Sequence, residues 1–249
     1  MSVLVVIPAR YASSRLPGKP LVSLVGKPMI QHVWERASRA TGVSRVLVAT
    51  DDDRILQAVR QFGGEAVMTR PDHRSGTGRV AEVAAHSKEE IVINVQGDEP
   101  LIDPAAIAAL LDSFLDEEVS LATLCTPIRE QRDIMDPNIV KVVLDFQGDA
   151  LYFSRAPIPW IRGDGRPGAP RHLKHIGLYA FRRETLLEFL TLPPGELEEL
   201  EQLEQLRWLE NGYRIRVVET DYDSVSVDVP DDVPRVEKLL NEVDGSKSL

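Results

Sequence analysis

The feature of this sequence that most constrains its fold is an alternation of short apolar runs with segments of helical periodicity over the first 115 residues. The runs at 3–7, 45–50, 65–69 and 91–95 have the length of strands, and the last is apolar almost throughout, as in parallel strands covered on both faces. This alternation predicts an α/β fold with a doubly wound, mostly parallel sheet. Ligands of such sheets bind at the carboxyl ends of the strands.

Residues 119–181 carry a different pattern, in which strand-like runs are separated by turns. We predict that they form a β-rich subdomain within a single domain over residues 1–249. This subdomain adds strands to the sheet and offers a surface for a dimer. The acid-rich segment 193–211 places leucines on a helical stripe from Leu197 to Leu209, which is too short for a long coiled coil.

The composition limits the classes of function. With 249 residues, of which 43% are hydrophobic and 27% charged, the chain has the composition of an ordinary soluble globular protein. Its formal net charge of −10 argues against broad nucleic-acid binding, which relies on basic patches. The single cysteine, Cys125, excludes an intrachain disulfide and a cysteine-based zinc cluster, and fits a reducing cytoplasm. No apolar run is long enough to cross a bilayer, so we expect neither secretion nor membrane insertion.

The loop that follows the first apolar run is cationic, although the chain as a whole is acidic. The first 34 residues contain four basic side chains and no acid. Three of them, Arg10, Arg15 and Lys19, lie in a loop that contains prolines and a glycine, before any predicted helix. Such a loop suits a polyanion such as a nucleoside triphosphate, and a solvated basic loop is the alternative.

A glycine-containing segment follows the third predicted strand. Gly76, Gly78 and Ala81 match the pattern G-x-G-x-x-A of dinucleotide-binding loops. The match is weak, because that fingerprint turns tightly out of the first strand of its fold, whereas here several residues intervene and the unit is the third. We therefore prefer a nucleotide-contacting loop in which Ser75, Thr77 and backbone amides lie near a base. The phosphate-binding pattern G-x-x-x-x-G-K-[ST] is absent.

Carboxylates at predicted strand ends are candidate metal ligands. Asp98 follows the buried run at 91–95, beside a glycine that lets a ligand approach. Asp103, which precedes a proline, is the better cap for the next helix, and this leaves Asp98 to meet a magnesium ion and phosphates. Asp228 is predicted to end a late strand, so the two carboxylates are candidates to share one divalent ion. The aspartates at 51–53 are interpreted as a helix cap rather than a metal site.

His175 and Tyr179 lie four residues apart in a predicted strand, and therefore on the same face. A lone histidine in such a place is more often structural than functional. The residues by themselves leave the role of His175 open.

Motifs spread over nearly the whole chain carry a resemblance to a known family. They are IPARYASSRLPGKPL, VATDD, MTRPDHRSGTGR, NVQGDEP, NIVKVVLD, LYFSRAPIPW, KHIGLYAF, LEQLRWLENG and VDVPDDVPRV, in that order. Together they resemble the 3-deoxy-manno-octulosonate (KDO) cytidylyltransferases, and SRAPIPW followed by H-x-G-x-Y is typical of the KDO branch. The resemblance implies a nucleotide-diphospho-sugar transferase-like fold and a homodimer. It also implies Mg²⁺-dependent transfer of CMP from CTP to the anomeric hydroxyl of KDO, with release of pyrophosphate, for lipopolysaccharide biosynthesis.

The same resemblance implies roles for particular residues. The residues expected to act in catalysis are Arg10, Arg15, Lys19 and Asp98. Nucleotide contacts are expected at Ala9, Arg10, Ser14, Lys19, Ser75, Gly76 and Thr77. Sugar-acid contacts are expected at Gln96, Arg155, His175, Tyr179, Glu204 and Gln205. The expected metal ligands are Asp98 and Asp228.

Two positions depart from the family pattern. Gly78 stands where the family usually has an acidic residue, and Val229 where it usually has threonine. The first bears on contacts to the base and the second on the geometry at Asp228. Rival interpretations are transfer to another acid sugar, either 8-amino-KDO or sialic acid, and a non-catalytic nucleotide-binding protein. An NAD-dependent enzyme is a more distant alternative.

Overall fold

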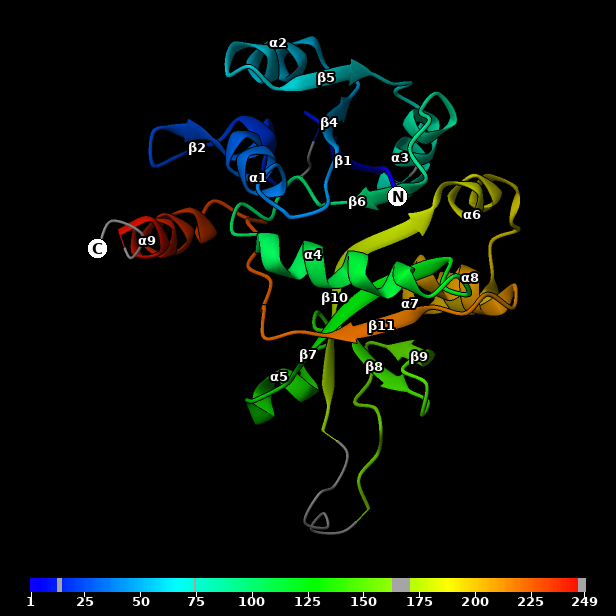
Figure 1. The fold of residues 1–249 in the computed structure, drawn as a ribbon. Helices are drawn as coiled ribbons and strands as arrows, with labels where there is room; N and C mark the ends of the chain where they lie inside the picture. Colours follow the sequence, from blue (N-terminus) through cyan, green and yellow to red (C-terminus); the bar gives the residue numbers. More distant parts are fainter. Residues whose placement is uncertain (13–14, 74, 163–170, 246–249) are drawn as a thin grey trace.

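The computed structural model describes residues 1–12, 15–73, 75–162 and 171–245 (Figure 1). Its strands are β1 (Val3–Ala9), β2 (Ser23–Leu24), β3 (Lys27–Pro28), β4 (Arg45–Thr50), β5 (Glu65–Met68), β6 (Ile91–Asn94), β7 (Leu121–Pro127), β8 (Lys141–Leu144), β9 (Ala150–Ser154), β10 (Leu173–Arg182) and β11 (Arg216–Glu219). Its α-helices are α1 (Met29–Ala37), α2 (Asp53–Gln61), α3 (Gly76–Ala85), α4 (Pro104–Asp112), α5 (Gln131–Met135), α6 (Arg183–Glu188), α7 (Glu196–Glu201), α8 (Gln205–Glu210) and α9 (Asp232–Gly245). Short 3-10 helices are η1 (Lys19–Leu21), η2 (Ser113–Leu115) and η3 (Phe189–Thr191).

Within these ranges, nine strands form one sheet. Its main path is β11-β7-β10-β6-β1-β4-β5, and β8 and β9 extend it beside β10. The predicted strands near the N-terminus are confirmed: β1 pairs in parallel with β4 and β6, and β4 pairs in parallel with β5. The antiparallel pairs come from the predicted β-rich excursion, because β10 runs against β6, β7 and β8. The α/β fold with a mixed, doubly wound sheet is as expected.

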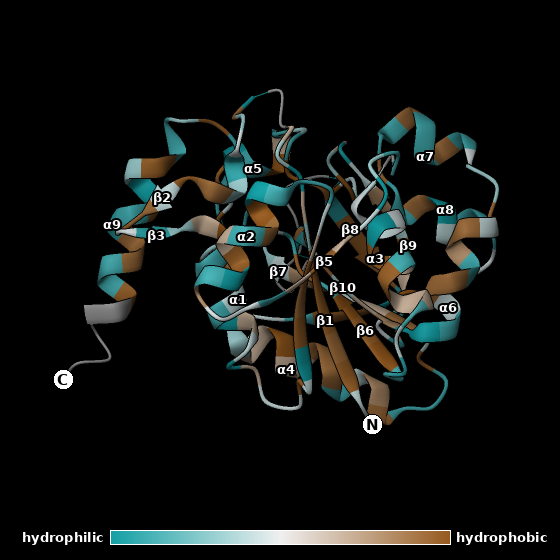
Figure 2. Ribbon diagram, turned by 90° about the horizontal axis from the view of Figure 1, so that it is seen from above, coloured by the Kyte–Doolittle hydropathy of each residue, from teal (hydrophilic) through white to brown (hydrophobic). Residues whose placement is uncertain are grey.

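The alternation of side chains along each strand divides the core into two layers. On β1, Val3, Val5 and Ile7 join the cluster covered by α1, α2 and α4. Leu4 and Val6 point to the other face, which α3, α6 and α8 cover. Figure 2 shows the apolar strands at the centre, with helices outside that carry both polar and apolar residues. Burial on both faces explains why these runs are almost continuously apolar.

Helix starts follow the predicted capping chemistry. Asp52 accepts a hydrogen bond from the Arg54 amide at the start of α2, at 2.9 Å. Asp103 does the same for the Ala105 amide at the start of α4, also at 2.9 Å. The interpretation of residues 51–53 as a cap is therefore confirmed through Asp52, and Asp103 leaves Asp98 available for other contacts.

Two predicted elements differ in the structure. The leucine stripe is divided between α7 and α8, because Gln202 adopts a left-handed conformation with φ of 53° between them. The segment around Asp228 is not a strand, so the prediction that Asp228 ends one is wrong. This segment crosses from β11 to α9 and inserts Val227 into a small apolar cluster with Leu24 and Met29. None of the helices in the described ranges has the length and apolarity needed to cross a bilayer.

Candidate active site

The loops after β1 and β6 meet at the carboxyl edge of the sheet and enclose a cavity of about 330 Å³. A Cβ on Gly97 would lie 2.9 Å from the carbonyl oxygen of Pro8, so only glycine allows this approach of the two loops. The cavity is lined by Pro8, Ala9, Arg10, Ala12, Arg15, Lys19, Pro20, Gly76, Gln96, Gly97 and Asp98. The predicted cationic residues and Asp98 are thus brought together, although they lie far apart in the sequence.

Local contacts fix the position of Lys19 at the start of η1. The amide of Gly18 donates to the carbonyl of Tyr11 at 2.9 Å, and Gly18 has a φ of 70°, which favours glycine. The guanidinium carbon of Arg54 lies 3.3 Å from the centroid of the Tyr11 ring. This stacking holds the cationic loop against the start of α2.

Lys19 joins the two predicted metal ligands. Its Nζ lies 2.5 Å from Oδ2 of Asp98 and 3.0 Å from Oδ1 of Asp228. Arg15 contacts the same Oδ1 at 3.0 Å. Burial disfavours the ammonium of Lys19, but the charges and hydrogen bonds of Asp98 and Asp228 outweigh it and raise the pKa of Lys19. One cation therefore reaches oxygens of both carboxylates.

Backbone contacts, rather than a strand, hold Asp228 in this place. The amide of Val227 donates to the carbonyl of Asp98 at 3.0 Å. The amides of Asp228 and Val229 both donate to Oδ2 of Asp232, at 2.8 and 3.0 Å. Val229, one of the departures from the family pattern, takes part through its backbone, so a threonine hydroxyl is not needed for these contacts.

A second cavity, of about 430 Å³, adjoins the first and shares Gly76 and Gln96 with it. It is lined by Gly76, Thr77, Asn94, Gln96, Asn138, Ile139, Val140, Lys174, His175, Gly177, Tyr179, Phe181, Leu203, Glu204, Gln205, Trp208, Ser224 and Ser226. Five of the six predicted sugar contacts are in this lining. Four further lining residues, Asn94, Asn138, Lys174 and Trp208, are not among the predicted sugar contacts, although the motifs NVQGDEP, NIVKVVLD, KHIGLYAF and LEQLRWLENG contain them.

Arg155 is the sixth predicted sugar contact, and it lies outside both linings. Its Nε donates to the carbonyl of Glu201 at 2.7 Å, and one terminal nitrogen donates to the carbonyl of Pro137 at 2.9 Å. The other terminal nitrogen lies 3.3 Å from the carbonyl of Gln202. Its guanidinium therefore contacts backbone around the cavity rather than the cavity itself.

His175 is a buried, neutral side chain at the cavity wall. Its Nε2 lies 3.0 Å from Oγ1 of Thr123, and its ring packs 5.4 Å from that of Tyr179. Burial lowers the pKa of His175 to about 3. The two side chains share a face as predicted, even though the pairing of β10 with β7 shifts between Ile176 and Tyr179.

This depressed pKa predicts that acid destabilises the protein through His175. Below the ordinary pKa of about 6.5, His175 of the unfolded chain binds a proton, whereas His175 of the folded chain stays neutral down to about pH 3. The folded state therefore loses stability as the pH falls through this window. Between pH 7 and pH 5, the free energy of unfolding of the wild type falls by about 2 kcal/mol more than that of His175→Gln. Urea titrations of both proteins at the two pH values measure the difference. Parallel losses in the two proteins would contradict the assignment.

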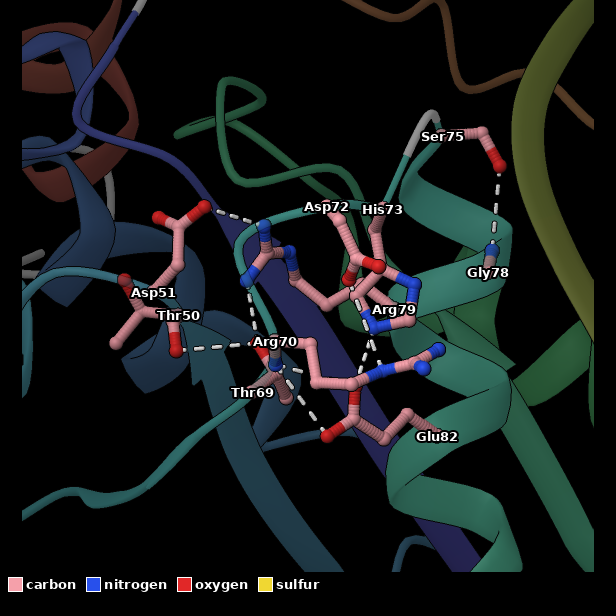
Figure 3. A network of polar contacts seen from close by, with 10 residues as sticks. All are labelled: Thr50, Asp51, Thr69, Arg70, Asp72, His73, Ser75, Gly78, Arg79 and Glu82. Carbon is pink, nitrogen blue, oxygen red and sulfur yellow. Dashed lines mark hydrogen bonds and ion pairs between the residues drawn. The ribbon is translucent and has the colours of Figure 1, made fainter.

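A buried ion pair positions the N-terminus of α3, which contributes Gly76 and Thr77 to the cavities (Figure 3). Arg79 is fully buried and places a terminal nitrogen 2.6 Å from Oδ2 of Asp51, at the end of β4. It also donates to the hydroxyl of Thr69, after β5. The aspartate run thus contributes a packing contact through Asp51 in addition to the cap.

We expect Arg79→Met to lower the free energy of unfolding by about 2 kcal/mol, because it leaves Asp51 and Thr69 without their buried partner. Urea denaturation measures this loss. The matched control is Arg70→Met, since the side chain of Arg70 is 68% exposed, and its effect is expected to stay within about 0.5 kcal/mol. Equal stability of the two variants would count against the role of Arg79.

The remaining predicted nucleotide contacts have different outcomes. Ser75 caps α3, since its Oγ accepts the amide of Gly78 at 3.2 Å, and its side chain is in neither lining (Figure 3). Gly78 is also outside the linings, and a Cβ there would lie 3.4 Å from Nδ1 of His73. Ser14 lies outside the described residues. The glycine pattern at 76–81 therefore starts a helix beside both cavities.

Glu99 is a buried carboxyl next to Asp98 that the sequence analysis did not single out. Burial, together with the charge of Asp98, raises the pKa of Glu99 to about 7. The hydroxyl of Tyr222 lies 3.3 Å from its Oε2 and opposes this shift. A protonated Glu99 adds no negative charge to a site that already has two carboxylates.

Comparison with known proteins identifies the family. The cytidylyltransferase family model matches residues 4–215. The chain is 54% identical, over 96% of its length and 94% of the relative's, to 3-deoxy-manno-octulosonate cytidylyltransferase of Solibacter usitatus (strain Ellin6076). It is 53% identical, over 96% of its length and 100% of the relative's, to the protein of that name from Geobacter sulfurreducens (strain ATCC 51573 / DSM 12127 / PCA).

A solved structure gives the same result. The structure of CMP:2-keto-3-deoxy-manno-octonic acid synthetase complexed with CTP superposes with a TM-score of 0.93 at 48% identity, covering 97% of this chain and 99% of that one. This chain belongs to the 3-deoxy-manno-octulosonate cytidylyltransferase family.

Proposed function

We propose that this protein transfers CMP from CTP to the anomeric hydroxyl of KDO and releases pyrophosphate. The observation that carries the proposal is the pair of adjoining cavities, one lined by Arg10, Arg15 and Lys19 and the other by hydrogen-bonding side chains and aromatic rings with a single lysine among its lining residues. The first suits a triphosphate and the second suits a sugar. The names of the relatives and the CTP complex of the similar structure support this assignment.

The reaction requires the two substrates to meet where the cavities join, at Gly76 and Gln96. There the anomeric oxygen forms a bond to the α-phosphorus, the bond from that phosphorus to the bridging oxygen breaks, and pyrophosphate leaves with the electron pair. The hydroxyl proton passes to solvent. The protein contributes in-line placement of the two substrates and stabilisation of the negative charge that develops. Arg10, Arg15 and Lys19 stabilise the charge that develops on pyrophosphate.

Asp98 and Asp228 fit the magnesium ion that the family implies. Both place a carboxylate oxygen against one ammonium, that of Lys19, so a single cation lies within reach of both. Two carboxylates with room for phosphate oxygens and water are a donor set that Mg²⁺ accepts. When bound, the ion supplies charge neutralisation for the phosphates. Lys19 is then free to turn from the carboxylates to the nucleotide.

The second cavity provides contacts for a hydroxylated acid. His175, Tyr179, Glu204 and Gln205 present hydrogen-bonding groups, and His175 stays uncharged at neutral pH. Among the described residues of this lining, Lys174 is the one lysine or arginine, and its Nζ lies 2.7 Å from Asp223. We assign it as the counter-charge for the carboxylate of the sugar acid.

The remaining features of the proposal concern the setting of the enzyme. We place the reaction in the cytoplasm, where CTP is available, with its product directed to lipopolysaccharide. We propose one domain and a homodimer formed through the β-rich excursion. Exposed apolar side chains on this excursion support the dimer, namely Phe146, Leu151 and Trp160. Sedimentation velocity tests it, and a monomer at micromolar concentration would reject it.

The function is tested by pyrophosphate release from CTP and Mg²⁺ with KDO, 8-amino-KDO and N-acetylneuraminate side by side, each with and without EDTA. We expect release that depends on KDO and is abolished by EDTA. Preference for another acid sugar would show that the second cavity was assigned the wrong substrate, while the nucleotide site would stand. Binding of CTP without release with any sugar would favour a non-catalytic nucleotide-binding protein.

A further inference from the structure

Lys141 is a lysine whose charge the reaction does not use. It is the first residue of β8, and it is fully buried. Its Nζ donates to three backbone carbonyls, of Asp136 at 2.9 Å, Ile139 at 2.6 Å and Arg155 at 2.6 Å. An ammonium has three N–H groups, so these bonds use all of its donors.

Two of these carbonyls belong to one segment beside the second cavity: that of Ile139 is on a lining residue, and that of Asp136 lies three residues before it. Asn138, Ile139 and Val140 line that cavity, and the segment contains neither a strand nor a helix that would hold it. Within the segment, the amide of Asn138 bonds Oδ1 of Asp136, and the amide of Ile139 lies 3.2 Å from the carbonyl of Asp136. At its end, the carbonyl of Val140 accepts the amide of His175 on β10 at 2.8 Å, so residues 136–139 are the part that Lys141 holds. Lys141, which is the first residue of β8, bonds the carbonyls at both ends of this turn.

The third carbonyl connects this segment to a second one that lines the cavity. The guanidinium of Arg155 bonds the carbonyls of Pro137, Glu201 and Gln202. The segment after Gln202 presents Glu204 and Gln205 to the cavity. Lys141 holds the backbone of Arg155, and Arg155 holds both segments.

Burial makes it costly to open this cluster. A buried ammonium is tolerated only while its donors are all bonded, and the carbonyls it contacts lose their partners if it is removed. The segment therefore cannot move away without exposing the ammonium of Lys141 to solvent or leaving it without hydrogen-bond partners. By contrast, the residues that line the first cavity are not among the hydrogen-bond partners of the Lys141 ammonium.

We propose that Lys141 is a positioning residue for the sugar acid: by fastening residues 136–139 and the backbone of Arg155, it sets the width of the second cavity. The proposal rests on the proposed function for the identity of the ligand. It makes the affinity for KDO, and not that for CTP, depend on a lysine that touches neither.

The test compares Lys141→Met, which keeps the length of the side chain and removes the donors, with the wild type. Lys238→Met is the matched control, because Lys238 is 79% exposed on α9, outside both cavities. Steady-state pyrophosphate release gives the KM for each substrate. We expect the KM for KDO to rise about tenfold in Lys141→Met, and that for CTP to change less than about twofold.

Hydrogen exchange supplies a readout that does not need activity. The amides of Asn138 and Ile139 are expected to exchange about tenfold faster in Lys141→Met, while those of β1 and β6 keep the wild-type rate. If the methionine variant does not fold, Lys141→Arg, which keeps the charge on a longer side chain, carries the same two comparisons.

Unchanged KM values in a folded variant would overturn the proposal. An equal rise in both KM values would also overturn it, since that would indicate a general structural role. A wild type that does not act on KDO would defeat the proposed function. In that case, exchange at Asn138 and Ile139 still decides whether Lys141 fastens the segment, and unchanged exchange there would reject it.

Discussion

Asp98→Asn is expected to lower turnover by two orders of magnitude or more, about the loss seen when a principal charge stabiliser is removed. The substitution keeps the shape of the side chain but removes the negative charge that, with Asp228, surrounds the Lys19 ammonium in this structure. A cation at this position then has one carboxylate ligand instead of two. The measurement is pyrophosphate release at saturating CTP, KDO and Mg²⁺.

The matched control is Asp103→Asn, five residues further along the chain. Asp103 caps α4, and asparagine is an equally good cap, so this variant should keep its activity. Near-normal turnover of Asp98→Asn at saturating Mg²⁺ would contradict the metal-ligand assignment. Equal losses in both variants would indicate damage to the loop after β6 rather than loss of a ligand.

Lys19→Met is expected to lower kcat/KM for CTP by about three orders of magnitude. The variant removes one of the three cations that line the first cavity, so the triphosphate binds with one opposing charge fewer. It also removes a donor for the leaving pyrophosphate. The value of kcat/KM for CTP should fall, whereas the affinity for KDO should stay nearly unchanged. Separate binding titrations with CTP and with KDO measure the two affinities.

Lys27→Met is the matched control for charge. Lys27 bonds Glu35 at 2.8 Å and lies in neither cavity lining, so its loss should leave catalysis within about twofold of the wild type. A Lys19→Met variant that retained more than a tenth of wild-type kcat/KM would remove Lys19 from the catalytic assignment. The adjacent cations Arg10 and Arg15 would then have to provide the charge stabilisation.

Much of the framework is determined by local sequence. Short apolar runs locate β1, β4, β5 and β6, because the length and composition of such a run are read from neighbouring residues. Capping chemistry is local as well, so Asp52 and Asp103 could be assigned from the residues beside them. The rule that ligands bind at the carboxyl ends of parallel strands then placed Arg10, Lys19 and Asp98 at one edge, and the structure agrees.

The tertiary structure alone determined how distant segments complete the site. Lys19 and Asp228 are separated by 209 positions, and Asp228 reaches its place on an irregular segment rather than at the predicted strand end. Arg155 and Lys141 have long cationic side chains whose partners are backbone carbonyls, which are present at every residue and leave no signal in the sequence. Periodicity reports which side of an element is buried, whereas the partner of a buried charge depends on packing between elements.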